Sequence, residues 1–169
     1  MKSGLLFGIL LSLTSLTANA VVYENKELTE NQIYTIQRAY ELGNESGYGL
    51  TLAAIALTES RAGVNLINKK SGDYGVFQNN LRSTTKRIEQ LTGSKMSYRS
   101  RIKLRNELIN SMESSANYAL MELDYWKKVR GGNWRKVVES FNAGYGSNKT
   151  YVETVAQNVR FLRNCDCIK

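Results

Sequence analysis

The sequence predicts a predominantly α-helical fold, and three observations support this prediction. Apolar residues recur at helical spacing through most of the chain after residue 20. The chain contains no proline, the residue that most often breaks a helix. Two capping-box patterns, at residues 29–32 and 150–153, place a hydroxyl three residues before a glutamine or glutamate, as helix starts do. We expect one domain over residues 21–169.

The first 20 residues predict a secretory signal. Lys2 supplies a positive charge, a mostly apolar run from Leu5 to Leu16 follows, and Ala18-Asn19-Ala20 has the small residues that a signal peptidase requires. The run is shorter than the roughly 20 apolar residues that span a bilayer. We therefore expect a cleaved signal peptide at 1–20 and a periplasmic protein, with tethering by an uncleaved signal as the alternative.

The first two expected helices differ in their patterns. The first begins after Thr29, turns one apolar face inward, and ends before Gly43. The second begins at Gly49 and is apolar on nearly all sides between residues 52 and 57. A helix of this kind lies in the centre of a domain, because no side of it favours water. It should end between Glu59 and Gly63.

The middle of the chain predicts a loop followed by three helices. Residues 63–80 contain three glycines and no helical period, which indicates a loop with a short hairpin around Leu66-Ile67. Amphipathic patterns then predict helices at about 83–91, 101–112 and 116–129. Gly131-Gly132 should stop the last of them.

Two further helices are expected towards the C-terminus. Asn133 can cap a helix that ends in the turn at residues 142–144. The second capping box should start a final helix at Thr150, with its apolar residues turned inward. Cys165 and Cys167 follow this helix, and three states stay open for them: an internal disulfide, a bridge to another chain, or free thiols.

Composition excludes several kinds of chemistry. The chain has no histidine, so it contains no histidine-based triad and no histidine metal site. The formal net charge of +8 favours an anionic partner. Nucleic acid is a poor candidate for an exported protein, whereas peptidoglycan and anionic lipid are polyanions that such a protein meets. A merely solvated basic surface would give the same count.

Glu59 is the strongest candidate for a catalytic residue. It lies at the C-terminal end of the most apolar helix, immediately before the glycine-containing loop. Desolvation disfavours the charged carboxylate, and the negative end of the helix dipole acts in the same direction. Both effects raise the pKa, which is what a general acid needs at neutral pH.

Three motifs around Glu59 resemble an established family. Residues 56–60 read Ala-Leu-Thr-Glu-Ser, residues 75–78 read Gly-Val-Phe-Gln, and residues 140–144 read Ser-Phe-Asn-Ala-Gly, with Tyr-Val following at 151–152. In this order they resemble the signature of lysozyme-like lytic transglycosylases. The resemblance covers about residues 51–155 and implies a lysozyme-like α-helical domain with a short loop or hairpin after the catalytic helix.

The resemblance also implies an activity. Glu59 would protonate the oxygen of the β-1,4 bond between N-acetylmuramic acid and N-acetylglucosamine in peptidoglycan. The same carboxylate would then accept the proton of the muramyl C6 hydroxyl as that oxygen attacks C1, which gives a 1,6-anhydromuramyl end. No second carboxylate, cofactor or metal is required, unlike in most glycosidases.

Five further residues match the motifs and are expected to bind substrate or orient the acid. They are Ser60, Gly75, Gln78, Asn142 and Tyr151. Ser60 would bond near the scissile region or steady Glu59, Gly75 would let the loop backbone approach the sugar, and the two amides would contact N-acetyl groups or orient the acid.

One position departs from the family pattern. Phe141 stands where the family usually has a tyrosine whose hydroxyl lies near the acid. Tyr145 or Tyr151 could supply that hydroxyl instead. Other aromatic residues at helical spacing, such as Tyr118, Tyr125 and Trp126, are predicted to belong to the core.

Two other functions remain open. Asp73 could activate water, which would make the protein a hydrolytic lysozyme, although an aspartate before a loop glycine is usually a turn residue. Alternatively, a non-catalytic glycan-binding protein could have kept the fold. The partners implied are glycan strands and, by analogy with small specialised transglycosylases, a secretion, conjugation, pilus or phage assembly.

Overall fold

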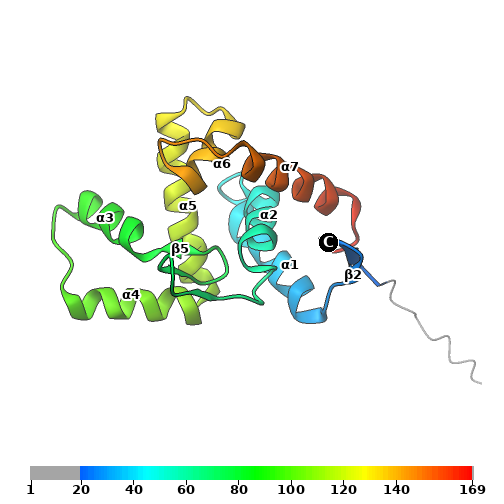
Figure 1. Ribbon diagram of the computed structural model, residues 1–169, viewed down its shortest axis with the longest axis horizontal. Coiled ribbons are helices and arrows are strands. Elements are labelled where there is room, and N and C mark those ends of the chain that lie inside the picture. The colour runs from blue at the N-terminus through cyan, green and yellow to red at the C-terminus, as the bar shows by residue number, and fades with distance from the viewer. Residues whose placement is uncertain (1–19, 169) are drawn as a thin grey trace, which may run out of the picture.

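Helix α2 (Gly49–Ser60) is the centre of the fold in the computed structural model, which describes residues 20–168 (Figure 1). The side chains of residues 52–56 are completely buried, as the apolar pattern predicted. Helices α1 (Glu30–Asn44) and α7 (Lys149–Asn164) pack along it. The predominantly α, lysozyme-like fold class is confirmed.

Helix α1 begins as the sequence predicts but ends differently. The Thr29 side chain accepts a hydrogen bond from the Gln32 amide, and the Gln32 side chain accepts one from the Thr29 amide. Gly43 was expected past the helix end, yet it lies in the last turn. A Cβ on Gly43 would approach the Leu52 Cβ and the Tyr48 backbone to 3.0 Å. This glycine therefore allows close packing of α1 on α2 and does not serve as a cap.

A short hairpin at the N-terminal side lies against the last helix. Strands β1 (Val22–Tyr23) and β2 (Lys26–Glu27) pair antiparallel, with Val22 opposite Glu27. The Tyr23 ring packs on Phe161 of α7 at a centroid distance of 5.1 Å, and its hydroxyl donates to Asn158. Except for Ala20, the predicted signal peptide lies outside the described residues.

Three two-residue strands stiffen the loop that follows α2. Strand β3 (Ile67–Asn68) pairs with β4 (Asp73–Tyr74), and β4 pairs with β5 (Asn79–Asn80), all antiparallel. The hairpin was expected at this place, but the third strand was not. Strand β5 is anchored by Asn79, whose amide donates to the Ser115 carbonyl and hydroxyl at 3.0 Å each.

Helices α3 (Leu81–Thr92) and α4 (Tyr98–Asn110) extend to one side of the molecule, and α5 (Met112–Val129) joins them to the centre (Figure 1). Each helix begins two to four residues earlier than the hydrophobic pattern predicts. The reason is local capping, because Asn80, Ser97 and Ser111 each accept a hydrogen bond from an amide three residues later.

Helix α6 (Trp134–Ala143) is capped by Asn133 and ends at Gly144, as expected. The capping box predicted at Thr150 is wrong. Helix α7 starts at Lys149, because the Asn148 side chain accepts a hydrogen bond from the Tyr151 amide. Cys165 and Cys167 form a disulfide after the helix. Within residues 20–168, every helix is either too short or too polar to span a lipid bilayer.

Candidate active site

A polar cleft of about 700 Å³ opens between the β-hairpin and α3 on one side and helices α5 and α6 on the other. Glu59 lies in it, at the end of the central helix. Other residues that line it include Asp73, Gln78, Asn80, Arg87, Tyr118, Glu122, Tyr125, Trp126, Phe141, Asn142 and Tyr145. The cleft therefore joins residues from all three sequence motifs.

A tight turn ends α2 directly after Glu59. Arg61 and Ala62 both have left-handed backbones, with φ of 52° and 54°, which is unfavourable for residues other than glycine. Ser60 stabilises the turn, since its hydroxyl donates to the Ala56 carbonyl and accepts from the Gly63 amide at 2.8 Å. Ser60 is completely buried and does not line the cleft. Of its two expected roles, only steadying Glu59 fits this position.

Tyr151 is the direct partner of Glu59. Its hydroxyl donates to Glu59 Oε1 at 2.7 Å, and this leaves the second carboxyl oxygen available for a proton. Tyr151 itself is only 8% exposed. Burial and the adjacent carboxylate raise the pKa of the tyrosine well above its ordinary value, so the hydroxyl stays a donor. The Tyr151 hydroxyl thus contacts the Glu59 carboxyl. The family tyrosine, which Phe141 replaces in this chain, was expected to provide a hydroxyl near the acid.

The surroundings of Glu59 hold its carboxyl partly protonated at neutral pH. Burial raises the pKa of Glu59 to about 7, the Tyr151 hydrogen bond opposes this rise, and the nearby negative charge of Asp73 adds to it. Burial has the largest effect. A carboxyl group with this pKa can donate and accept a proton in one catalytic cycle near neutral pH.

Asp73 lies in the same cleft as Glu59, on strand β4. Its carboxylate accepts a hydrogen bond from the Asn80 side chain at 2.8 Å, across the β4–β5 pair. This contact fixes the hairpin and leaves carboxylate lone pairs facing the cleft. Asp73 therefore links the two strands and also places a second carboxyl group in the cleft.

Gly75 has a role other than the one expected. Its φ is +81°, and a Cβ at this position would lie 2.0 Å from the Leu108 carbonyl oxygen and 2.6 Å from Ser115 Oγ. The close approach is to helices α4 and α5, and Gly75 does not line the cleft. The expectation that it lets the loop approach a sugar is corrected, because the backbone contact that excludes a side chain is within the protein.

Gln78 does line the cleft. Its side-chain amide donates to the carbonyls of Gly75 and Asn65 at 2.9 and 3.0 Å. Its backbone has a left-handed φ of +46°. With the NH2 group held by the loop, the amide oxygen is the atom left to contact a ligand. Asn142 lines the opposite wall, where its Oδ1 accepts from the Asn148 side chain at 2.8 Å. Its NH2 group is then the donor left for a ligand.

One wall of the cleft was not identified from the sequence. Arg87 of α3 forms an ion pair with Glu122 of α5 at 3.0 Å and lies 3.2 Å from the Tyr125 ring centroid. Tyr118, Tyr125 and Trp126 were predicted to be core residues, yet all three line the cleft. Trp126 is nevertheless 4% exposed, so it belongs to both. Hydrophobic periodicity could not distinguish core residues from cleft-lining residues, because both lie on inward faces of a helix.

The described residues contain no candidate metal centre. No group of three or more Cys, Asp or Glu side chains within residues 20–168 is placed to hold a metal ion.

A mainly helical fold with a single desolvated glutamate at the base of a polar cleft defines a lysozyme-like domain. The chain belongs to the Transglycosylase SLT domain family, whose pattern matches residues 39–161. This confirms the resemblance drawn from the three motifs.

One relative has been found in a bacteriophage. The chain is 36% identical over 124 residues to a protein of Enterobacteria phage T4, described as an uncharacterized 20.7 kDa protein in the vs-regB intergenic region. The alignment covers 72% of this chain and 66% of the phage protein, which is just under two thirds of the latter. No solved structure matches the chain.

Proposed function

We propose that the protein is a peptidoglycan lytic transglycosylase that cleaves the β-1,4 bond between N-acetylmuramic acid and N-acetylglucosamine without consuming water. Membership of the transglycosylase family supports this class of reaction. The observation that carries the proposal is the Glu59–Tyr151 pair, a desolvated carboxyl with a pKa of about 7 held in the cleft by one hydrogen bond.

The proposed reaction has two proton transfers, both at Glu59. The protonated carboxyl first gives its proton to the glycosidic oxygen, and the bond from that oxygen to muramyl C1 breaks. The C6 hydroxyl of the same sugar then attacks C1, and its proton returns to Glu59. The products are a 1,6-anhydromuramyl end and a free N-acetylglucosamine hydroxyl, so atoms and charge balance and the enzyme regains its starting state.

The remaining cleft residues are proposed to orient the substrate. The Gln78 amide oxygen can accept from an N-acetyl N–H, and the Asn142 amide can donate to an N-acetyl carbonyl. Gln78 lines the cleft from the loop, and Asn142 lines it from the end of α6. Tyr151 is a positioning residue, because it touches the acid and is almost fully buried.

A hydrolytic lysozyme is the second candidate, and the position of Asp73 favours it specifically. Asp73 lines the cleft and lies near enough to Glu59 to raise its pKa. Paired carboxyl groups flanking a glycosidic bond are the usual arrangement of glycoside hydrolases. In that reaction, Asp73 would activate water or stabilise the positive C1 centre.

Mass spectrometry of the muropeptides released from purified sacculi distinguishes the two reactions. Transglycosylation should give anhydromuramyl ends, which are lighter by one water molecule than the reducing ends left by hydrolysis. We expect anhydro ends from the wild-type protein and, at acidic pH, nearly unchanged turnover of Asp73→Asn. Reducing ends together with an inactive, folded Asp73→Asn protein would assign the chain to the hydrolases.

The pH dependence of activity tests the environment of Glu59. Activity should fall as the pH rises through about 7, because the acid loses its proton. Tyr151→Phe removes a hydrogen bond that favours the charged carboxylate, so the pKa should rise and this decline should move to higher pH, with a lower maximal rate. Asp73→Asn removes a repulsion, so the decline should move to lower pH.

The pH profiles of Tyr151→Phe and Asp73→Asn should therefore move in opposite directions from the wild-type profile. A purely structural role of Tyr151 would lower the rate at every pH without moving the profile. Profiles that do not move in either variant would show that Glu59 is not the group titrating in the reaction.

We also propose that the protein acts in the periplasm after export. The signal-like sequence at 1–20 supports export. The T4 relative makes a phage assembly one setting in which local opening of the cell wall would be used, and secretion, conjugation or pilus assemblies are the others. N-terminal sequencing of protein from the native host should return Val21.

A further inference from the structure

A second pocket lies beside the cleft, between α3 and α4, and has a volume of about 470 Å³. Ser71, Asn80 and Lys86 line both the pocket and the cleft, so the two adjoin over the N-terminal half of α3. A chain seated in the cleft would therefore lie next to the pocket.

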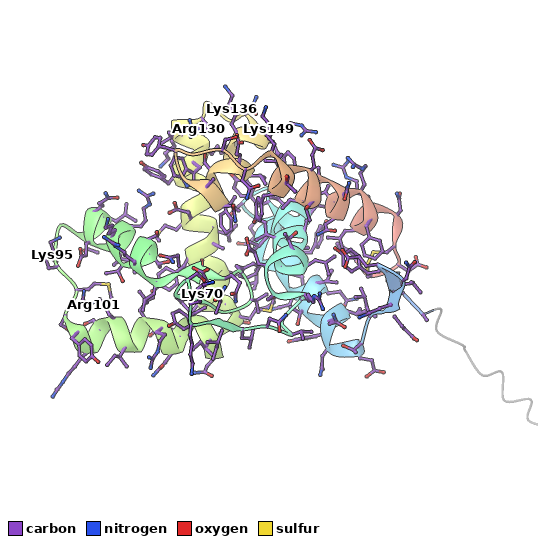
Figure 2. All side chains as sticks on the ribbon, viewed as in Figure 1. Lys70, Lys95, Arg101, Arg130, Lys136 and Lys149 are labelled. Atoms are coloured by element: carbon purple, nitrogen blue, oxygen red, sulfur yellow. A yellow bond between two sulfur atoms is a disulfide. The ribbon has the colours of Figure 1, made fainter. Side chains whose placement is uncertain are left out.

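The walls of this second pocket carry an excess of positive charge. Arg82, Lys86 and Arg101 line it, and none of them forms an ion pair with another residue between positions 20 and 168. Arg101 lies at the start of α4, close to the turn that joins it to α3 (Figure 2). Two of the cations are on α3 and one is on α4, and all three are exposed side chains that line the same pocket.

The carboxylate that lines the pocket has its own partners. Glu89 accepts hydrogen bonds from the Met96 amide at 2.8 Å and from Lys95 Nζ at 3.2 Å. Arg101 contributes only a weaker, longer-range attraction to it. The positive charge of the pocket is therefore not neutralised from within. Tyr74 and Leu81 add apolar surface to the same walls.

We propose that this pocket binds the acidic peptide that branches from a muramic acid of the strand held in the cleft. The inference rests on the proposed function. A short peptide with free carboxylates and small apolar side chains matches the charge and the mixed lining of the pocket, and such a branch begins on the strand itself. The pocket would thus make the enzyme prefer peptide-bearing strands to bare ones.

The test compares turnover of intact strands with turnover of strands whose peptides have been removed by an amidase. The variant is the double charge reversal Arg82→Glu, Arg101→Glu, since both residues line the pocket and neither lines the cleft. The matched control is Arg99→Glu, Lys136→Glu, which changes the net charge equally at exposed positions on α4 and α6. Thermal unfolding establishes that each protein is folded.

The expected result is a change in preference. The wild-type protein should turn over peptide-bearing strands faster, and the ratio of the two rates should fall about tenfold in the pocket variant, because two exposed charge contacts are reversed. The control should keep the wild-type ratio. An unchanged ratio in the pocket variant, or a wild-type protein that does not distinguish the strands, would overturn the proposal.

A binding measurement separates this inference from the proposed function. Free stem peptide is titrated into the Glu59→Gln protein, which needs no turnover, and the same peptide with amidated carboxylates is the control ligand. Saturable binding that is lost on amidation and in the pocket variant supports the site even if no glycan is cleaved. Equal binding of both peptides, or none, would overturn the site even if the enzyme is an active transglycosylase.

Discussion

Glu59→Gln should lower the turnover of peptidoglycan by about 10²–10⁴-fold, the usual contribution of general acid–base catalysis. Glutamine keeps the size of the side chain and can still accept the Tyr151 hydrogen bond through its amide oxygen. It cannot transfer a proton to the glycosidic oxygen or take one back. Binding of glycan strands should therefore be retained while release of anhydromuropeptides is lost.

The same substitution should also change the pH dependence of stability, and this change tests whether the Glu59 carboxyl is buried. Because folding raises the pKa of Glu59 from 4.5 to about 7, the wild-type protein loses stability between these pH values, since the carboxyl ionises in the unfolded state but stays protonated in the folded state. The loss is at most about 3 kcal/mol, at ~1.4 kcal/mol per pKa unit. Glu59→Gln has no such charge, so it should unfold at a higher temperature than the wild type at pH 8 and not at pH 4.

Three outcomes of this experiment lead to different conclusions. A stable and active Glu59→Gln protein would end the proposed mechanism. A wild-type protein that binds sacculi without releasing muropeptides would support the non-catalytic alternative. Loss of activity without the pH-dependent gain in stability would mean that Glu59 is more solvated in the protein than its place in the cleft indicates.

The helices and the catalytic helix could be predicted from the sequence because their signals are local. Thr29 and Asn133 act on amides three residues away, and the continuous apolar run of α2 can be satisfied only by burial on all sides. Glu59 was found because it ends that run. Where local signals competed, as at Asn148 and Thr150, the sequence alone did not decide which residue caps the helix.

The site was less predictable because motif residues serve the fold as well as the chemistry. Ser60 and Gly75 belong to the motifs, but one holds the turn after α2 and the other admits the Leu108 carbonyl. The Gly75 contact joins segments more than 30 residues apart, and no spacing rule indicates it, whereas the Ser60 hydrogen bonds are local. The sequence indicated only that Tyr145 or Tyr151 could supply the hydroxyl partner of Glu59. Tyr151 is the partner because α7 packs on α2.

Gly75→Ala should destabilise the protein by about 3–5 kcal/mol. Two costs combine: a left-handed backbone is strained by about 1–3 kcal/mol for a residue with a Cβ, and overpacking adds about 1–3 kcal/mol. The new Cβ would lie 2.0 Å from the Leu108 carbonyl oxygen. Backbone atoms cannot swing aside, so the loop or helix α4 must move.

Gly72→Ala is the matched control for this last prediction, because Gly72 lies in the same hairpin with a φ of +79° and has nothing within 4 Å of the position a Cβ would take. It should cost only the backbone strain, about 1–3 kcal/mol. Chemical denaturation of both variants measures the difference. If Gly75→Ala costs no more than Gly72→Ala, the packing of the loop on α4 is looser than the structure shows. If it costs more, displacement of the loop should also lower turnover at temperatures where the variant is still folded, because Gln78 and Asp73 are carried by the same segment into the cleft.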